Sequence, residues 1–213
     1  MIDSRFGSQV FVAAGLTSGR LLNACRCARK SGVEFLAGIP CTLGGAIYMN
    51  AGVRGRYIAD IVENVLVYRD GQVEVLSVYE CEYAYKSSVF MHTKDVILGA
   101  TLRLKGSEEE KIRATEEEYW RLRKHLPKGR SMGCVFKNVF QNGVMTSAGE
   151  WIEKAGLKGK CCGDAYVSEQ HANFIINMGN AKSRDIHSLI QIIKKEVYQQ
   201  FGITLQEEIQ YLE

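Results

Sequence analysis

Residues 38–52 read Gly-Ile-Pro-Cys-Thr-Leu-Gly-Gly-Ala-Ile-Tyr-Met-Asn-Ala-Gly, from Gly38 to Gly52, and form the most informative stretch of the chain. The stretch combines four glycines with one of the chain's two prolines and has no charged side chain. Glycine lets backbone N–H groups approach a ligand closely, and successive N–H groups in a turn form a concave site for phosphate. Apolar residues between the glycines argue against an exposed linker. The pattern indicates either a cofactor cradle or a tight turn before a core strand.

The composition is that of a folded protein. The chain has 213 residues, 46% of them hydrophobic and 24% charged, which suits one large domain or two small ones. A net charge of +3 without a basic cluster predicts no nucleic-acid partner. No apolar run is long enough to span a bilayer, and residues 1–5 lack the pattern of a signal peptide, so a cytoplasmic location is predicted.

Cysteine spacing predicts no metal site. The chain has seven cysteines, an odd number, and no secretion signal, so a disulfide framework is not expected. The close pairs Cys25/Cys27 and Cys161/Cys162 lack the spacing of a structural zinc site. We expect most of these thiols to be buried as small hydrophobic groups, with Cys134 as the exception.

The first half of the chain alternates strands with one helix. Residues 9–14 are typical of a strand, and Ser18 is a candidate cap for a helix that Gly32 would end. Residues 61–76 predict a β-hairpin because the Asp70-Gly71 pair favours a tight turn. Residues 96–104 predict another strand.

The second half begins with a charged helix. Acidic residues at 108–110 and basic residues at 121–124 suit the two ends of a helix dipole, and we interpret this helix as the connector to a second domain. Ser147 and Glu150 have the spacing of a capping box for a short helix. A last helix is expected over 184–201, with an apolar stripe that belongs to a core, and a strand over 205–212.

Several motifs, taken in order, resemble one family. They are residues 37–52, Tyr-x-x-Ser-x-Phe at 85–90, Gly-x-Val-Phe-Lys-Asn at 133–138, and the segments 147–159 and 167–174. Together they resemble UDP-N-acetylenolpyruvoylglucosamine reductase, also called UDP-N-acetylmuramate dehydrogenase. Their common order and spacing make the resemblance specific.

The resemblance implies an α+β fold and flavin chemistry. Residues 1–105 would form the second half of an FAD-binding portion of the p-cresol-methylhydroxylase and vanillyl-alcohol-oxidase (PCMH/VAO) type. Residues 106–126 would connect it to a substrate-binding domain over 127–203, and residues 204–213 would form a C-terminal strand. NADPH would reduce FAD, a hydride would pass to the enolpyruvyl double bond of a UDP-sugar, and the product would be UDP-N-acetylmuramate. The chain looks like the subtype without an extra loop.

Three residues are assigned catalytic roles by the resemblance. Cys134 takes the place of the proton donor, which is usually serine, and a thiol is the stronger acid. Glu208 occupies the position of the C-terminal catalytic glutamate. Lys86 stands where the family has an arginine that holds the substrate carboxylate, and a cation there would stabilise negative charge in the transition state.

The resemblance also implies binding residues. The nine expected to bind the cofactor are Gly38, Ile39, Pro40, Gly44, Gly45, Ala46, Asn50, Ala51 and Gly52. The six expected to bind the substrate are Tyr85, Ser88, Lys137, Asn138, His171 and Asn173.

The chain departs from the family pattern at several points. Lysine offers a point charge at position 86 where arginine offers a planar fork, Gln210 replaces a usual arginine, and residues 127–132 are unusually basic. No counterpart of the family's N-terminal flavin subdomain is found. We therefore expect one of three possibilities: a reductase fragment, a reductase completed by a second polypeptide, or an inactive homologue that only binds UDP-sugars.

Overall fold

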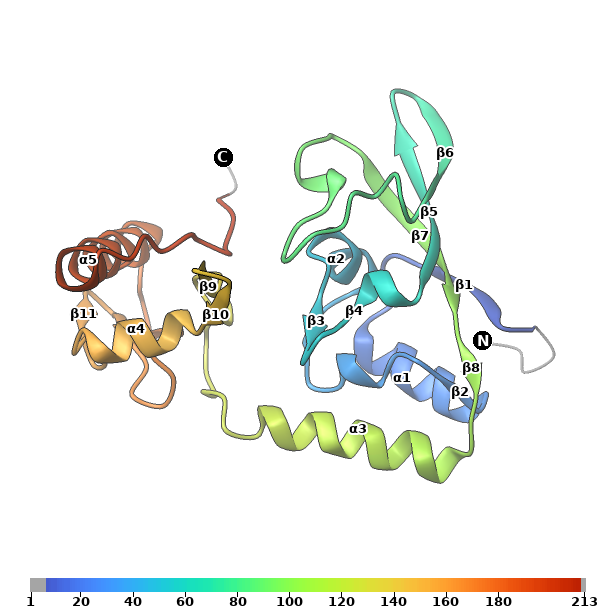
Figure 1. Cartoon of the computed structure of the whole chain (residues 1–213), viewed down its shortest axis with the longest axis horizontal. Helices are drawn as coiled ribbons and strands as arrows, with labels where there is room; N and C mark the ends of the chain where they lie inside the picture. The colour runs from blue at the N-terminus through green and yellow to red at the C-terminus, as the bar shows by residue number, and fades with distance from the viewer. Residues whose placement is uncertain (1–6, 212–213) are drawn as a thin grey trace. The chain divides into compact units, whose positions relative to one another are not determined.

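The chain folds into two compact units, with the boundary between Lys124 and His125. The structure is a computed structural model and describes residues 7–211 (Figure 1). Each unit combines helices with antiparallel strands and has its own hydrophobic core. The predicted α+β class is therefore confirmed.

The first unit is built on a four-stranded antiparallel sheet with the strand order β1-β7-β5-β6. The strands are β1 (Gln9–Ala13), β5 (Val62–Arg69), β6 (Gln72–Ser77) and β7 (Val96–Arg103), close to the predicted ranges. Asp70 and Gly71 have φ angles of 47° and 87°. These left-handed backbones allow a two-residue turn between the paired residues Arg69 and Gln72, which confirms the predicted hairpin.

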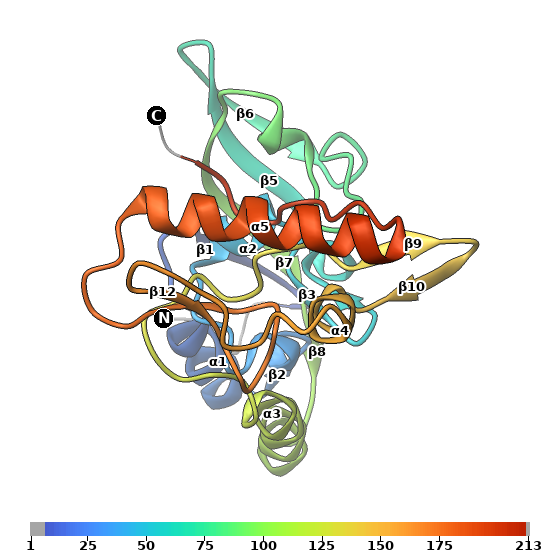
Figure 2. The same ribbon diagram turned by 90° about the vertical axis from the view of Figure 1, so that its left-hand side faces the viewer.

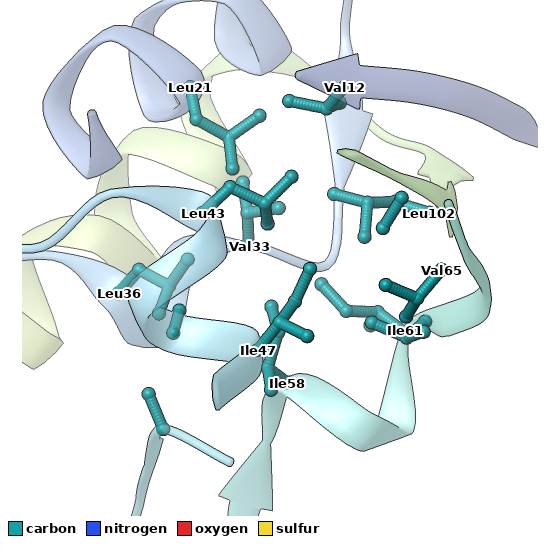
Figure 3. Close-up of a cluster of buried hydrophobic side chains, with 14 of the residues drawn as sticks. Val12, Leu21, Val33, Leu36, Leu43, Ile47, Ile58, Ile61, Val65 and Leu102 are labelled. Carbon is teal, nitrogen blue, oxygen red and sulfur yellow. The ribbon is translucent and has the colours of Figure 1, made fainter. Parts of the chain in front are cut away.

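The core of this unit lies between one face of the sheet and the helices beside it (Figure 3). Leu21 comes from α1 (Ser18–Cys27), and Leu43 and Ile47 come from α2 (Leu43–Tyr48). They pack in one cluster with Val65 and Leu102 of the sheet, and all five are at most 1% exposed. Removal of this apolar surface from water is what holds the helices on the sheet.

Helix α1 begins and ends differently from the prediction. Thr17, not Ser18, is the N-cap residue, and its side chain makes no capping hydrogen bond. Ser18 lies in the first turn, where its hydroxyl donates to the carbonyl of Ile39 at 2.5 Å. The helix ends at Cys27, before Gly32. The predicted cap is wrong because Ser18 has a tertiary acceptor.

The glycine-rich stretch contains a helix, so the predicted turn before a strand is wrong. The Thr42 hydroxyl accepts from the N–H of Gly45 at 3.2 Å and caps α2. The chain then forms a small ribbon of β3 (Gly52–Val53) and β4 (Arg56–Tyr57). A Cβ at Gly52 would lie 2.3 Å from Cδ1 of Tyr57, so this position needs glycine.

Helix α3 (Glu109–Arg123) follows the sheet and has the predicted order of charges, acidic first and basic last. It buries Ile112 and Glu116 against the first unit, so the connector helix is also a packed element of that unit. The remaining short elements of this unit are β2 (Lys30–Ser31), β8 (Lys105–Gly106) and the 3₁₀ turns η1 (Glu34–Leu36), η2 (Ile58–Asp60) and η3 (Val89–Met91).

The second unit combines two helices with short strands. Its strands are the hairpin of β9 (Val139–Gln141) and β10 (Val144–Thr146), and the sheet of β11 (Cys161–Cys162), β12 (Ala165–Val167) and β13 (Ile175–Asn177). Its helices are α4 (Ala148–Lys154) and the long α5 (Ser183–Phe201) (Figure 2). The stripe of α5 is buried, which confirms the prediction that it belongs to a core.

The segment after α5 is extended, but the predicted strand over 205–212 is wrong for the described part, which ends at residue 211. Glu207 forms an isolated bridge with Phe136, and no neighbouring pair extends it into a ladder. Position 212 of this prediction, and position 213 of the C-terminal strand 204–213 implied by the resemblance, lie outside the described residues.

Candidate functional site

Three extended segments meet in the second unit. Phe136 forms a bridge with Glu207, and Cys134 forms one with Phe174. Backbone N–H groups join the segments: Lys137 donates to Gln206 at 2.8 Å, Glu208 donates to Val135 at 2.7 Å, and Val135 donates to Asn173 at 2.9 Å. Residues 134–137 therefore lie between residues 173–174 and residues 206–208. The structure brings together the backbone segments of Cys134 and Glu208, although these residues are far apart in the sequence.

Asn173 fastens two of these segments to each other. Its side chain is 2% exposed. The amide oxygen accepts from the N–H of Phe136 at 2.9 Å, and the amide nitrogen donates to the carbonyl of Phe136 at 2.8 Å. Both ends of the amide are thus used inside the protein, and these two hydrogen bonds form a clasp between Asn173 and Phe136. In this structure Asn173 fixes the backbone beside Cys134.

His171 is half-buried next to this clasp. Its Nδ1 accepts from the N–H of Asn173 at 3.3 Å, and its ring meets Phe174 edge to face at 5.0 Å between centroids. Burial lowers the pKa of His171 below its usual range, and the nearby Lys158 acts in the same direction. A neutral ring with an accepting Nδ1 carries its proton on Nε2. The ring can therefore donate a hydrogen bond from that nitrogen.

Lys137 and Asn138 follow Phe136 in the chain. Asn138 is exposed, and its side-chain oxygen accepts from the N–H of Ala148 at 3.4 Å, at the start of α4. The capping box predicted there is wrong, because the N-cap residue Ser147 makes no side-chain capping bond. Asn138 accepts from the first turn of this helix instead. Lys137 is half-buried.

In the first unit, a small loop carries the predicted residues Tyr85, Lys86 and Ser88. Ala84 and Ser87 exchange two backbone hydrogen bonds of 3.1 and 3.2 Å, which makes Tyr85 and Lys86 the tip of a tight turn. Lys86 has a φ of 52°, in the left-handed region that non-glycine residues seldom adopt. The fold thus holds this lysine in a costly backbone conformation.

Two buried side chains tie that loop to the end of α2. The Ser88 hydroxyl donates to the carbonyl of Tyr48 at 2.7 Å, and Ser88 is 1% exposed. The Asn50 amide nitrogen donates to the carbonyl of Ala84 at 2.9 Å. The amide oxygen of Asn50 accepts from the N–H of Ala59 at 3.3 Å. Ser88 and Asn50, predicted to contact ligands, thus place the loop that carries Lys86.

The start of α2 is not a free anion site. The N–H groups of Leu43 and Gly44 donate to the carbonyls of Leu16 and Ala14 at 2.9 and 2.8 Å. The N–H of Gly45 donates to the hydroxyl of Thr42. These three amides are satisfied inside the protein, so the cradle of N–H groups expected from the sequence is wrong at these positions. Ala46 and Ala51 are buried in the core.

Gly38, Ile39 and Pro40 line a groove of about 390 Å³ between α1 and α3. Leu22 and Trp120 add further apolar surface to its walls. A second hollow shares Trp120 with this groove.

The loop at the groove is fixed from both helices. Ser18 of α1 donates to the Ile39 carbonyl, and Nε of Arg123 in α3 donates to the Gly38 carbonyl at 2.9 Å. At the floor, Arg26 and Glu116 form an ion pair of 2.6 Å, with the Glu116 side chain 9% exposed. The groove is therefore built by tertiary contacts and not by a flexible loop.

All seven cysteines are free thiols and all lie within residues 7–211. Cys27 and Cys161 are exposed, Cys25 and Cys81 are buried and the other three are intermediate, so the expectation that most of the thiols are buried is wrong. Burial, with the carboxylates of Glu34 and Glu116, raises the pKa of Cys25 to about 12, so this thiol stays protonated. Among the described residues, no three His, Cys, Asp or Glu side chains form a group that could hold a metal ion.

The predicted site residues fall into two sets, one in each unit. The first unit holds the glycine-rich stretch and the loop with Lys86, and the second holds Cys134, Lys137, Asn138, His171, Asn173 and Glu208. Within residues 7–211, no helix is long and apolar enough to cross a membrane.

One group beside the site was missed from the sequence. Glu207 bonds to Lys194, which lies 13 residues earlier on α5, and to Tyr211. No local pattern reveals such a contact, because the turn after the helix decides which residues of the tail return to it. The only available signal was the position of Glu207 next to Glu208.

The fold and the paired segments define an α+β protein of two units with an assembled site in the second. Residues 124–212 match the family model of the UDP-N-acetylenolpyruvoylglucosamine reductase C-terminal domain. The chain belongs to the UDP-N-acetylenolpyruvoylglucosamine reductase family.

Relatives and a solved structure support this membership. The chain is 37% identical to the reductase of Anoxybacillus flavithermus over 206 residues, which is 95% of this chain and 67% of the relative. It is 40% identical to that of Synechococcus elongatus, again over 95% and 67%. The crystal structure of UDP-N-acetylenolpyruvylglucosamine reductase from Thermus caldophilus has a TM-score of 0.83 at 35% identity, over 97% of this chain and 74% of that one.

Proposed function

We propose that the protein acts in peptidoglycan precursor synthesis in the cytoplasm as an NADPH-dependent, FAD-containing reductase. It would convert UDP-N-acetyl-3-O-(1-carboxyvinyl)-glucosamine into UDP-N-acetylmuramate. The observation that carries the proposal is the pairing of the segments that hold Cys134 and Glu208 in a member of this family. Reduction of an enol ether needs a hydride at one carbon and a proton at the next.

The proton is the part of the reaction assigned to this chain. When bound, FAD supplies the redox chemistry, because it can take a hydride from NADPH and pass it to the double bond. Cys134 would donate the proton to the adjacent carbon, and Glu208 would assist at the reacting group from the neighbouring segment. Lys86 would hold the substrate carboxylate, where a cation stabilises the negative charge that develops.

The other predicted site residues are assigned to substrate and cofactor as follows. Tyr85, Lys137, Asn138 and His171 are the proposed contacts to the UDP-sugar. Ser88 and Asn173 would support those contacts by fixing the backbone, since their polar atoms bond inside the protein. A ring of the flavin nucleotide would lie in the groove lined by Gly38, Ile39 and Pro40, against the apolar side chains of Leu22 and Trp120. The pyrophosphate would need donors other than the amides of residues 43–45.

We further propose that residues 1–105 are a flavin subdomain of the PCMH/VAO type, that 106–126 connect the domains, and that 127–203 bind the substrate. The chain spans 67–74% of the length of the relatives described above. An added flavin subdomain is included in the calorimetric test of the alternative.

The experiment compares Cys134→Ala and Cys134→Ser with the original chain in the presence of FAD, NADPH and the enolpyruvyl substrate. We expect Cys134→Ala to lower turnover by at least about a hundredfold while NADPH still bleaches the flavin absorbance. Cys134→Ser is the matched control and should retain turnover. Survival of turnover in the alanine variant would remove Cys134 from the mechanism.

The alternative is a homologue that only binds UDP-sugars. Calorimetry with UDP-N-acetylglucosamine distinguishes it from the reductase. Heat of binding in a chain that takes up no FAD, with or without an added flavin subdomain, would support the binding protein and contradict the reductase.

A further inference from the structure

The tail that carries Glu208 is held on the site by few backbone contacts. Helix α5 ends at Phe201, the C-cap residue Gly202 has a left-handed φ of 67°, and Leu205 lies in the core at 2% exposed. Beyond Leu205, backbone hydrogen bonds from Lys137 to Gln206 and from Glu208 to Val135 join the tail to the segment with Cys134. A single bridge of this kind is too short to be stable alone.

A second set of contacts fixes the same tail through Glu207. Lys194 of α5 donates from Nζ to Oε1 of Glu207 at 2.8 Å. The hydroxyl of Tyr211 donates to Oε2 at 2.7 Å. Both oxygens of one carboxylate are therefore engaged, one by the helix and one by the tail itself.

The surroundings of this carboxylate favour its charged form. The Glu207 side chain is 17% exposed and that of Lys194 is 35% exposed. Burial alone would raise the pKa of Glu207, but the hydrogen bonds from Lys194 and Tyr211, with the nearby His187, hold it below its usual value. Tyr211 also meets the His187 ring edge to face at 5.8 Å, so α5 contacts the tail at two points.

We infer that Lys194 and Tyr211 are positioning residues for Glu208, which act through the carboxylate of Glu207. Residues 207 and 208 share a peptide bond, so an anchor on one side chain limits where the other can point. The inference deepens the proposed function, since it rests on the catalytic role of Glu208.

Amide hydrogen exchange tests the anchor directly. In Lys194→Met and Glu207→Gln, we expect the N–H groups of Glu208 and Lys137 to exchange about fivefold faster, as loss of a partly exposed ion pair allows. Lys195→Met is the matched control, because Lys195 is exposed on the same helix and makes no described side-chain bond. Lys194→Arg should restore the slow exchange. Unchanged exchange in both Lys194→Met and Glu207→Gln would overturn the inference.

Turnover then separates positioning from stability. With FAD, NADPH and substrate, Lys194→Met and Tyr211→Phe should lower kcat by about fivefold with KM unchanged. Faster exchange with an unchanged kcat would mean that the anchor is structural only, and would also overturn the inference. If the original chain shows no turnover even with an added flavin subdomain, the proposed function fails, and the exchange rates alone decide whether Glu207 anchors the tail.

Discussion

Asn173 shows how one side chain can shape a candidate site from inside the protein. Its amide replaces a missing strand pair, because it accepts from and donates to the two backbone groups of Phe136. An asparagine before a strand is often a turn residue, so the sequence did not reveal this contact. The two partners lie 37 residues apart. The sequence singled out Asn173 as a site residue, but the bonds of its side chain depend on the fold.

Replacing this asparagine should destabilise the second unit. Asn173→Ala leaves two buried backbone groups of Phe136 without partners, which costs about 2–5 kcal/mol. The measurement is urea unfolding followed by Trp151, the tryptophan of this unit, in a Trp120→Phe background. The exposed Asn180→Ala provides the control and should change the free energy of unfolding by less than about 0.5 kcal/mol. Equal free energies of unfolding for Asn173→Ala and Asn180→Ala would contradict the stabilising role of the clasp.

At the scale of elements, local chemistry predicted some segments and misled at others. The hairpin of β5 and β6 was predictable because Asp70 and Gly71 specify the turn by themselves. Helix α2 was missed because glycine disfavours helices, and the cap at Thr42 and the burial of Leu43 and Ile47 compensate for that. The tail looked like a strand, but a strand requires partners along its length, and the fold supplies only one bridge.

The adjacent glycines of α2 give a matched pair of variants. A Cβ at Gly45 would meet only the Thr42 hydroxyl at 3.5 Å, so Gly45→Ala should stabilise the helix by about 0.5–1 kcal/mol. A Cβ at Gly44 would lie 3.0 Å from the Cβ of Ala14, so Gly44→Ala should lose that gain or reverse it. Thermal unfolding of both variants checks that Gly45→Ala is the more stable of the two. A less stable Gly45→Ala variant would contradict the described environment of α2.

Over the whole molecule, the two units have separate cores, and each contains one of the two tryptophans. The class of fold and the family could be predicted from the sequence. The order of the motifs and the alternation of strands and helices can be read from the chain without knowing how its segments pack. The clasp at Asn173 and the anchor at Glu207 could not, since both depend on how distant segments return to one another. The prediction of a cradle of backbone N–H groups was wrong for the same reason, since the carbonyls of Ala14 and Leu16 accept from two of these N–H groups.

Acid should weaken the first unit through Asp95. Arg69 donates to its two oxygens at 2.9 and 2.6 Å, and these bonds hold the pKa of Asp95 below its usual value. A lowered folded pKa adds stability above the unfolded pKa of about 3.9, and this contribution disappears as the pH falls further. Asp95→Asn should therefore be less stable than the original chain at pH 7, with the difference shrinking towards pH 3.

Fluorescence of Trp120 in a Trp151→Phe background reports this unit, and the exposed Glu82→Gln serves as control. A difference between the original chain and Asp95→Asn that stays constant from pH 7 to pH 3 would refute the assignment.

The exposed thiols of Cys27 and Cys161 affect how any preparation of this protein behaves in air. Dissolved oxygen converts accessible thiols into cross-links between copies, whereas the buried Cys25 is protected. A dimer seen on a gel without reductant would therefore be a product of storage. Only a species that persists in fresh dithiothreitol reports the natural assembly.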